Sequence, residues 1–303
     1  MAINIYNIKK WHKMLTGKSV LHVNQDLGKY FETKELKGYY NNMMEKVSYV
    51  PHLVDSEELP VLHTESGGTF VFPVAVFQFA FGLLDYYYES KEEKYLVKFR
   101  QCADWAINMQ YPDGAWDNFS YIYPEYPYGS MAQGEGASLL VRAYKLFDDK
   151  KYLEAAGKAI NFMLKPLNEG GCTLFDGNHV VLQEYQHLPV VLNGWIFSWW
   201  GLYDYVLVTQ DSEVKKIMDK SLQTLVEFLP RFSCSYWSMY DLGGKITSPF
   251  YHNLHIAQME AMYRLTGCEV FHEYANKWRK QQGNKVYKTI AFVRKCIQKI
   301  IER

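Results

Sequence analysis

The residues best suited to chemistry in this chain are tyrosines and one glutamate, gathered in three separated stretches. The stretches are residues 183–185 (QEY), 235–241 (SYWSMYD) and 248–258 (SPFYHNLHIAQ). They contain Glu184, Tyr185, Tyr240, Tyr251, His252 and His255. Brought together by the fold, they would form a site of phenols and one carboxylate. Such a set suits moving a proton on and off a carbon atom better than it suits hydrolysis or phosphate transfer.

Helical hairpins are the elements that must position these residues. From about residue 73 the sequence repeats an apolar helix, a short polar turn and an amphipathic helix. Corresponding points of the apolar helices, at Asp85, Ala143, Tyr203 and Met262, are 58, 60 and 59 residues apart. Helices that are apolar all round, each followed by an amphipathic partner, predict two concentric rings, as in an incomplete α/α toroid. An irregular all-helical bundle is the alternative.

The predicted organisation has three parts. Residues 1–70 form a small mixed segment that packs on the barrel, with an amphipathic helix over 1–15 and short strands at 19–23 and 69–72. Residues 71–283 form the toroidal catalytic domain, and residues 284–303 a basic amphipathic helix. Long aromatic loops join the hairpins, with small β-hairpins expected at 179–185 and 233–240. Ordered loops of this length are usually functional, so we expect them to line a cleft.

Composition narrows the classes of function. The chain has 303 residues with 25 Tyr, 17 Phe and 8 Trp. This abundance favours a sugar-binding site, although aromatic residues also fill cores and interfaces. The formal net charge is zero, which argues against nucleic acid as a partner. Five scattered cysteines without a CxxC motif predict reduced thiols, and no signal peptide or membrane span is recognised, so we expect a cytoplasmic protein.

Six sequence blocks, taken in order, resemble the C-terminal helical catalytic domain of D-glucuronyl C5-epimerases. These enzymes convert glucuronate into iduronate in heparan-type chains. The blocks are residues 128–135 (YGSMAQGE) with 140–144 (LVRAY), 184–185 (EY), 191–194 (VLNG), 201–204 (GLYD), 240–242 (YDL) and 251–258 (YHNLHIAQ). The resemblance covers about residues 105–280. The first 70 residues do not visibly match the β-rich domains of animal members.

The resemblance implies catalytic roles for Glu184, Tyr185, Tyr240 and Tyr251. One position departs from the family pattern. Animal members have an arginine directly after the Tyr-Asp-Leu motif, where it can bind the substrate carboxylate, and this chain has Gly243 there. Lys245 is the nearest cation and is expected to replace that arginine.

The chemistry of a uronic acid supports the same set. Its C5 hydrogen lies next to a carboxylate, so removing that proton builds negative charge that the site must stabilise. Inversion needs one group to take a proton from one face and another to deliver a proton to the opposite face. Glu184 and Tyr251 are the expected pair, with burial moving the pKa of each toward the working pH.

Substrate contacts are expected from loop residues and from the six blocks that carry the family resemblance. The predicted substrate-binding residues are Trp116, Asp117, Tyr128, Gln133, Asn193, Trp237, Lys245, His252 and His255. Trp116 and Trp237 are the candidates for stacking on sugar rings. The two histidines could instead cap a helix or support catalytic residues. No third ligand stands at a typical spacing from them, so no metal site is predicted.

The sequence is compatible with three other functions. A polysaccharide lyase shares the removal of the C5 proton but then expels the 4-linked sugar. A glycoside hydrolase needs two carboxylates, for which Asp117 and Glu184 are the only pair to test. A toroid that binds carbohydrate without catalysis is the non-enzymatic reading. No GxGxxG motif follows a strand, so we expect no dinucleotide and no other organic cofactor.

Both ends of the chain are basic. Residues 1–18 have four lysines and no acid, and residues 284–303 have six basic residues against Glu302. In the C-terminal stretch Ile290, Val293, Ile297 and Ile301 share one helical face. This helix is expected either to dock on the toroid or to attach peripherally to an anionic inner membrane surface. The expected partner is a glycan containing uronic acid, with a homodimer left open.

Overall fold

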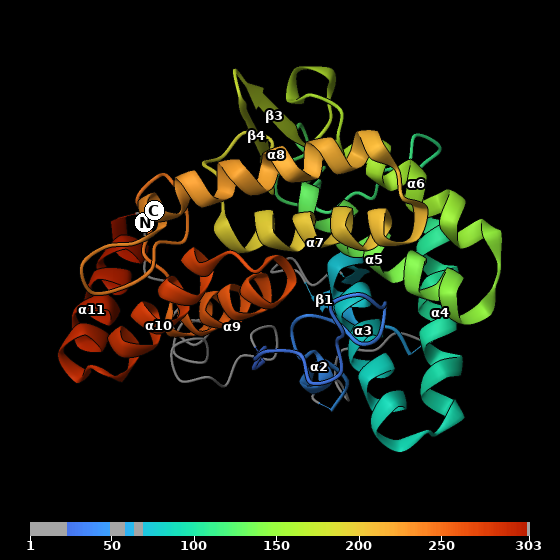
Figure 1. Ribbon diagram of the computed structural model, residues 1–303, viewed down its shortest axis with the longest axis horizontal. Helices are drawn as coiled ribbons and strands as arrows, with labels where there is room; N and C mark the ends of the chain where they lie inside the picture. Colours follow the sequence, from blue (N-terminus) through green and yellow to red (C-terminus); the bar gives the residue numbers. More distant parts are fainter. Residues whose placement is uncertain (1–22, 49–57, 64–68, 302–303) are drawn as a thin grey trace.

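The computed structural model describes residues 23–48, 58–63 and 69–301, and its described helices are arranged as hairpins (Figure 1). The hairpins pair α3 (Pro73–Ser90) with α4 (Glu93–Met109), α5 (Ser130–Phe147) with α6 (Lys150–Met163), α7 (Leu192–Thr209) with α8 (Ser212–Phe228), and α9 (Pro249–Thr266) with α10 (Glu269–Gly283). The four corresponding points of the predicted repeat, Asp85, Ala143, Tyr203 and Met262, each lie in the first helix of a hairpin. The repeat seen in the sequence is therefore a repeat of structure.

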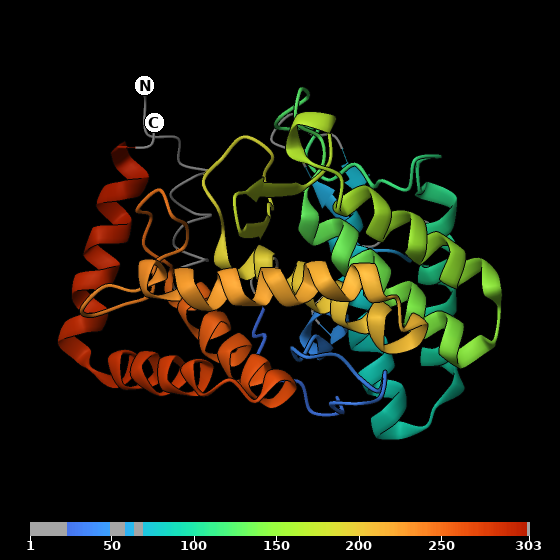
Figure 2. The same cartoon turned by 45° about the horizontal axis from the view of Figure 1, so that its top comes forward.

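The hairpins form two layers. The first helices contact one another in series, α3 against α5, α5 against α7 and α7 against α9, and each second helix packs behind its own first helix. The first helices are buried around most of their circumference, whereas a second helix such as α8 buries only one stripe of residues. The result is an open arc of hairpins, which confirms the predicted incomplete α/α toroid (Figures 1 and 2).

Every inner helix ends in the same kind of turn. The C-cap residues Lys91, Asp148, Gln210 and Gly267 are left-handed, with φ of 60°, 52°, 57° and 69°. Each C-cap N–H donates to the carbonyl four residues earlier, which closes the helix and reverses the chain. The Asp211 side chain then accepts from the first N–H groups of α8. Because each hairpin returns in this way, the inner helices all begin at one end of the arc and turn at the other.

Small residues let α5 and α7 pack with their backbones in contact. A Cβ atom on Gly201 would lie 2.5 Å from the Cα of Gly134, and one on Gly134 would lie 2.6 Å from the Cα of Ser198. The Ser198 hydroxyl donates to the Ser130 hydroxyl at 2.7 Å. A larger residue at either glycine would force the two helices apart.

The N-terminal segment fills the inside of the arc. Residues 23–48, with the short helix α2 (Met44–Ser48), pack against α3, and the rings of Tyr39 and Tyr40 are buried. Tyr39 stacks on Phe81 with ring centroids 3.7 Å apart. Strand β1 (Val61–His63) pairs with β2 (Thr69–Val71), close to the predicted strand at 69–72. The helix predicted over 1–15, and all but the last residue of the strand predicted at 19–23, lie outside the described residues.

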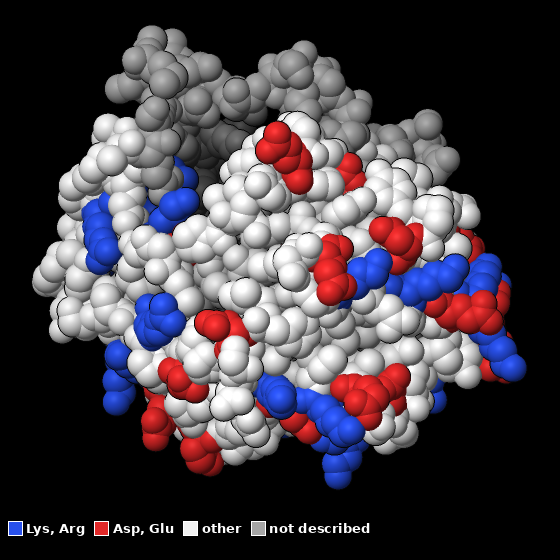
Figure 3. Space-filling model, turned by 90° about the horizontal axis from the view of Figure 1, so that it is seen from above, with Lys and Arg blue, Asp and Glu red and all other residues white. Residues whose placement is uncertain are grey.

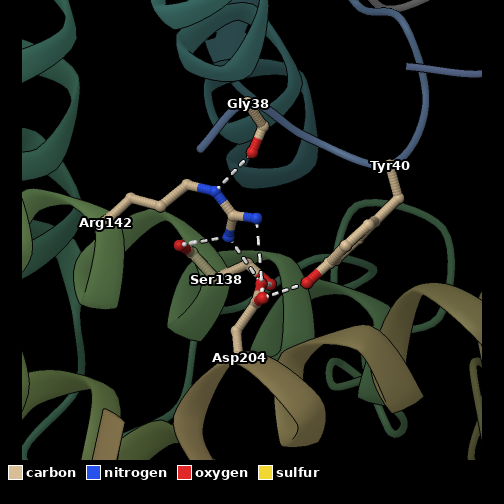
Figure 4. Close-up of polar contacts among 5 residues, drawn as sticks. All are labelled: Gly38, Tyr40, Ser138, Arg142 and Asp204. Carbon is tan, nitrogen blue, oxygen red and sulfur yellow. Dashed lines mark hydrogen bonds and ion pairs between the residues drawn. The ribbon is translucent and has the colours of Figure 1, made fainter. Parts of the chain in front are cut away.

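A buried ion pair fastens this segment to two inner helices (Figure 4). The Arg142 guanidinium of α5 donates to the Asp204 carboxylate of α7 at 2.5 Å and to the Gly38 carbonyl at 2.8 Å. The hydroxyls of Ser138 and Tyr40 donate to the same carboxylate. Burying a charge is unfavourable unless partners satisfy it, so these groups hold α5, α7 and the N-terminal segment in one arrangement.

The loops differ in how much strand they contain. Strand β3 (Thr173–Asp176) pairs with β4 (His179–Leu182), which confirms a hairpin near the predicted 179–185. The hairpin predicted at 233–240 is wrong, because there only isolated bridges form, between Ser233 and Ser238 and between Met239 and Ile246. Turns in this loop follow the surface of α10 instead of pairing in a regular ladder. Short 3-10 helices, η2 (Leu167–Glu169) and η3 (Leu229–Phe232), complete the loop structure.

The C-terminal helix α11 (Lys285–Ile301) stands at one end of the arc, beyond α10 (Figures 1 and 2). It packs on the loop between α8 and α9. Ala291 is buried with Trp237, and the Lys295 ammonium donates to the Ile246 carbonyl at 2.7 Å. The described part of the chain contains no helix that is both long and apolar enough to cross a bilayer.

The buried pair makes a testable prediction about stability. Replacing Asp204 by Ala (Asp204→Ala) leaves the Arg142 guanidinium buried without its counter-charge, which should lower the free energy of unfolding by about 3–5 kcal/mol. Asp219→Ala removes the exposed partner of Lys215 on α8 and should change it by less than about 1 kcal/mol. Urea unfolding of the two variants measures the difference. Equal effects would show that the pair does not hold the arc together.

Candidate active site

Backbone hydrogen bonds hold the loop that carries Tyr240 against the start of α7. The Leu192 N–H donates to the Tyr240 carbonyl at 3.2 Å, and the Leu242 N–H donates to the Val190 carbonyl at 3.0 Å. The Tyr240 N–H donates to the Lys245 carbonyl at 2.6 Å. Tyr240 therefore lies between two extended neighbours and next to the segment that follows Glu184.

Three phenols from three segments form one cluster. Ser248 caps α9 by accepting from the Tyr251 N–H at 3.4 Å, with Pro249 in the first helical position, so Tyr251 lies in the first turn. The rings of Tyr240 and Tyr251 meet at 67° with centroids 5.0 Å apart. The Tyr185 phenol lies close enough to Tyr240 and Tyr251 to interact with both electrostatically. The structure thus brings together the three tyrosines that the sequence analysis selected.

Glu184 lies beside this cluster in a site that offers its carboxyl little stabilisation. Its side chain is only 7% exposed, and its Oε2 has no hydrogen-bond partner in the described part of the chain. The backbone of α7 approaches so closely that a Cβ on Gly194 would lie 2.1 Å from Oε2. Burial raises the pKa of Glu184 to about 8, because the charged form loses its hydration.

The four groups are coupled electrostatically. Burial raises the pKa of Tyr185, Tyr240 and Tyr251, and the charge of Glu184 raises each of them further. All three phenols are therefore neutral near pH 7. Of the four groups, Glu184 loses its proton first as the pH rises, so it is the one suited to be a base.

Two histidines of α9 support the cluster. The Nε2 of His252 lies 3.0 Å from the Trp278 carbonyl and its Nδ1 lies 2.8 Å from the Ser238 hydroxyl, so both ring nitrogens are occupied. Trp237 stacks on the same ring at 3.6 Å. Burial lowers the pKa of His252 and of His255 to about 3, so both are neutral. His252 has both ring nitrogens occupied, so the prediction that it binds substrate directly is wrong. The substrate contact predicted for His255, which is buried with an Nε2 that has no partner in the described residues, stays a prediction.

The model of the D-glucuronyl C5-epimerase C-terminus family matches residues 99–280. The match covers more than half of the chain and includes Glu184 and the three tyrosines. The chain belongs to this family. The D-glucuronyl C5-epimerase of Caenorhabditis elegans is 28% identical over 219 residues, which cover 62% of this chain and 35% of that protein.

Two further proteins resemble this C5-epimerase family member. An uncharacterised protein of Methanocaldococcus jannaschii is 28% identical over 181 residues, covering 58% of this chain and 56% of that one. The chain thus spans about a third of the length of the nematode enzyme and just over half of the archaeal protein. The structure of cellobiose 2-epimerase from Bacillus thermoamylovorans B4167 matches with a TM-score of 0.55 and 12% identity, covering 86% of this chain and 77% of that one. At that identity the likeness concerns the toroidal fold alone.

Three predicted substrate-binding residues of this C5-epimerase family member belong to the core. Trp116 is fully buried, and its indole N–H donates to the Ala106 carbonyl at 2.8 Å. Trp237 is 1% exposed, because its ring stacks on His252. The Gln133 amide is bonded to both the N–H and the carbonyl of Trp116, each at 3.1 Å. The stacking role predicted for the two tryptophans is wrong, since neither offers a face to a sugar.

The remaining predicted contacts are closer to the loop surface or to Glu184. Asp117 uses its Oδ1 to accept from the Ser120 N–H at 2.9 Å, so it shapes the loop. Tyr128 is half-buried with its ring against Phe162. Asn193, the second residue of α7, has a buried Oδ1 with no hydrogen-bond partner in the described residues. Their roles in substrate binding stay predictions. No group of three or more His, Cys, Asp or Glu side chains is placed to hold a metal ion anywhere in the described ranges.

Glu135 is a buried carboxyl that the sequence analysis did not select. The Gln78 amide of α3 donates to its two oxygens at 3.1 and 3.4 Å, and the Gln25 amide donates to Gln78 at 3.4 Å. Burial raises the pKa of Glu135 to about 8, and the charge of Glu184 adds to the shift. The sequence held a signal for it, because Glu135 is the only charged residue of α5 before Arg142. A charge on a helix expected to be apolar all round needs a functional or structural reason.

Aromatic side chains on the loop before α5 extend outward from Tyr185. Tyr123 meets the Tyr185 ring edge to face with centroids 6.2 Å apart, and Tyr126 stacks on His187 at 4.2 Å. Tyr121 and Tyr126 are exposed. These rings, and not the two buried tryptophans, are the faces available for sugar stacking next to the cluster.

The raised pKa of Glu184 predicts how stability depends on pH. A carboxyl whose pKa is higher in the folded state binds its proton more tightly when folded, so the protein loses stability as the pH rises from about 4.5 to about 8. Glu184→Gln removes this dependence, and the variant should gain stability relative to the native protein between pH 5 and pH 8. Thermal unfolding at both pH values measures the gain. Glu154→Gln, on the exposed face of α6, is the control for removing a solvated carboxylate. A Glu184→Gln difference that is the same at both pH values would contradict the raised pKa.

Proposed function

We propose that this protein is a carbohydrate epimerase that inverts C5 of a hexuronic acid residue, interconverting D-glucuronate and L-iduronate within an oligo- or polysaccharide. The observation that supports this most is the buried carboxyl of Glu184, whose Oε2 has no hydrogen-bond partner in the described part of the chain, set beside a cluster of three tyrosines. Membership of the C5-epimerase family supports the reaction class.

Proton removal begins at Glu184. Its carboxylate takes the C5 proton, the C5–H bond breaks, and the electron pair moves into the adjacent substrate carboxylate. Tyr251 is a neutral phenol held by the first turn of α9, and it donates its proton to C5 from the opposite face. Glu184 is then protonated and Tyr251 is a phenolate. The Tyr240 ring lies 5.0 Å from that of Tyr251, centroid to centroid, and with Tyr185 it offers a route by which a proton passes from Glu184 to Tyr251 and restores both groups.

The charge that builds on the substrate carboxylate requires a cation or several hydrogen-bond donors. Lys245 is well placed for this role. It stands directly opposite Tyr240 on the short antiparallel stretch that contains the bridge between Met239 and Ile246. Directly opposed residues in such a pairing project their side chains on the same face. The Lys245 ammonium and the Tyr240 phenol therefore belong to one side of the loop.

A glycan chain also needs a surface beyond the reacting residue. The exposed rings of Tyr121 and Tyr126 continue outward from Tyr185. Flat rings of this kind stack on sugar faces and do so without demanding a particular charge. The substrate is thus a chain of sugars that passes over the loop before α5, with one uronate placed at Glu184.

Deuterium exchange at C5 tests the reaction. In deuterated water the native protein should introduce deuterium at C5 of glucuronate residues in a defined chain, detected by mass spectrometry and NMR. Glu184→Gln lacks the base and Tyr251→Phe lacks the opposite-face donor, so each should lower net epimerisation by about 10³-fold or more.

Tyr263→Phe, on the exposed part of α9, is the matched control and should keep its activity. Products with new ultraviolet absorbance would instead identify a lyase, and new reducing ends without absorbance a hydrolase. Near-native turnover in either site variant would remove that residue from the proposed mechanism.

Lys245 provides a separate test of substrate binding. Lys245→Ala should raise KM for glucuronate-containing chains by about tenfold or more, because the substrate carboxylate loses the cation proposed to bind it. Lys245→Arg should retain most of the affinity. Initial rates over a range of substrate concentrations give both parameters. Unchanged kinetics in Lys245→Ala would show that another group binds the carboxylate.

A further inference from the structure

Helix α11 packs on the loop before α9 with one face and exposes apolar side chains on another. On the docked side, the Gln298 side chain accepts from the Ile246 N–H at 2.9 Å, and the Arg294 guanidinium donates to the Tyr236 hydroxyl at 3.0 Å. Ala291 is buried between these contacts. This side faces the loop that also carries Tyr240, so the helix is an integral part of the fold and its orientation is fixed.

The exposed face of α11 consists of large apolar side chains. Half of the exposed large hydrophobic residues in the described part of the chain, eight of sixteen, belong to this single helix. They are Val286, Tyr287, Ile290, Phe292, Val293, Ile297, Ile300 and Ile301, which are between 36% and 75% exposed. At 100° per residue, Ile290, Val293 and Ile297 lie within 60° of one another around the helix. They form a ridge about two turns long, and an exposed ridge of this size normally meets another surface.

The charge of the helix indicates what that surface is. From Lys285 to Ile301 there are five basic residues and no acid. Lys285, Lys288 and Lys299 lie beyond the edge of the ridge, and Lys295 is used inside the fold. Figure 3 shows basic side chains at the end of the molecule where α11 stands, whereas the opposite end mixes basic and acidic ones. A basic helix of this kind complements an anionic surface.

We infer that α11 lies in the plane of an anionic lipid surface, with its apolar ridge among the acyl chains and its lysines at the headgroups. The ridge consists of flexible aliphatic side chains, which fluid acyl chains accommodate without a matching surface. A long amphipathic helix with lysines on its polar side is the form that interfacial binding favours. This inference does not depend on the proposed reaction.

The attachment would also fix where the candidate site lies. Because α11 packs on the loop of Tyr240, a bound membrane stands at that end of the arc and not at the end formed by α4 and α6 (Figure 2). A glycan tethered to lipid near the membrane surface would then meet the site from the side of α11.

Sedimentation with lipid vesicles tests the inference. The whole protein is mixed with vesicles of phosphatidylcholine alone, or of phosphatidylcholine with one third phosphatidylglycerol. It should bind the anionic vesicles about tenfold more than the neutral ones, and binding should fall when the salt is raised from about 0.1 M to about 1 M. The double variant Ile290→Asp/Ile297→Asp should lose binding to both kinds of vesicle.

Matched controls separate the ridge from general surface properties. Val97→Asp/Met109→Asp places the same charges on exposed apolar positions of α4 and should bind like the native protein. Lys285→Gln/Lys288→Gln should lose the preference for anionic vesicles, whereas Lys215→Gln/Lys216→Gln on α8 should keep it. Equal binding to neutral and anionic vesicles, or no binding, would overturn the inference. So would light scattering that shows a dimer broken by Ile290→Asp/Ile297→Asp, because the ridge would then be an interface between copies.

Discussion

The ion pair between Arg142 and Asp204 is the constraint on which the interior of the arc depends. Two charges far from water are stable only while their donors and acceptors remain in place, so the pair tolerates one arrangement of α5, α7 and the N-terminal segment. Arg142 is seven residues beyond Glu135, about 10 Å along the same helix. Fixing α5 against α7 at the ion pair therefore also fixes the distance between Glu135 and the start of α7, where Glu184 lies.

The buried carboxyl groups of Asp204 and Glu184 differ in their hydrogen-bond partners. Asp204 is surrounded by donors from Arg142, Ser138 and Tyr40, which make it a structural group. Glu184 has an oxygen with no hydrogen-bond partner among the residues that the structure describes, so its charge is poorly stabilised. A carboxyl that is unstable as an anion is a stronger base and changes its protonation near neutral pH. Asp204 and Glu184 thus differ in the number of hydrogen-bond donors that surround each carboxyl group.

The hairpin repeat was predictable because helix periodicity and all-round hydrophobicity are local properties of the sequence. The meeting of Glu184 with the tyrosines was also predictable, since the inner helices begin at one end and the intervening loops must gather there. The burial of Trp116 and Trp237 was not, because a loop rich in aromatic residues does not reveal which ring faces water. Each of these rings has its partner, Ala106 or His252, in a segment distant enough that only tertiary structure reveals it. Lys295, buried although it is a lysine, shows the same limit.

Because of the four left-handed turns, the two ends of the inner helices differ in how well they tolerate changes to the chain. Three of the turns contain Lys91, Asp148 and Gln210 in place of glycine, and the turns follow the ends of the inner helices, whereas the candidate site lies at the starts of α7 and α9. The backbone hydrogen bond of each turn depends on no particular side chain. The turn end is therefore where the chain could be opened to new termini, or given a label or an inserted domain, at little consequence for the inner helices. The opposite end allows no such change, because there every loop between hairpins also positions the carboxyl and phenols of the site.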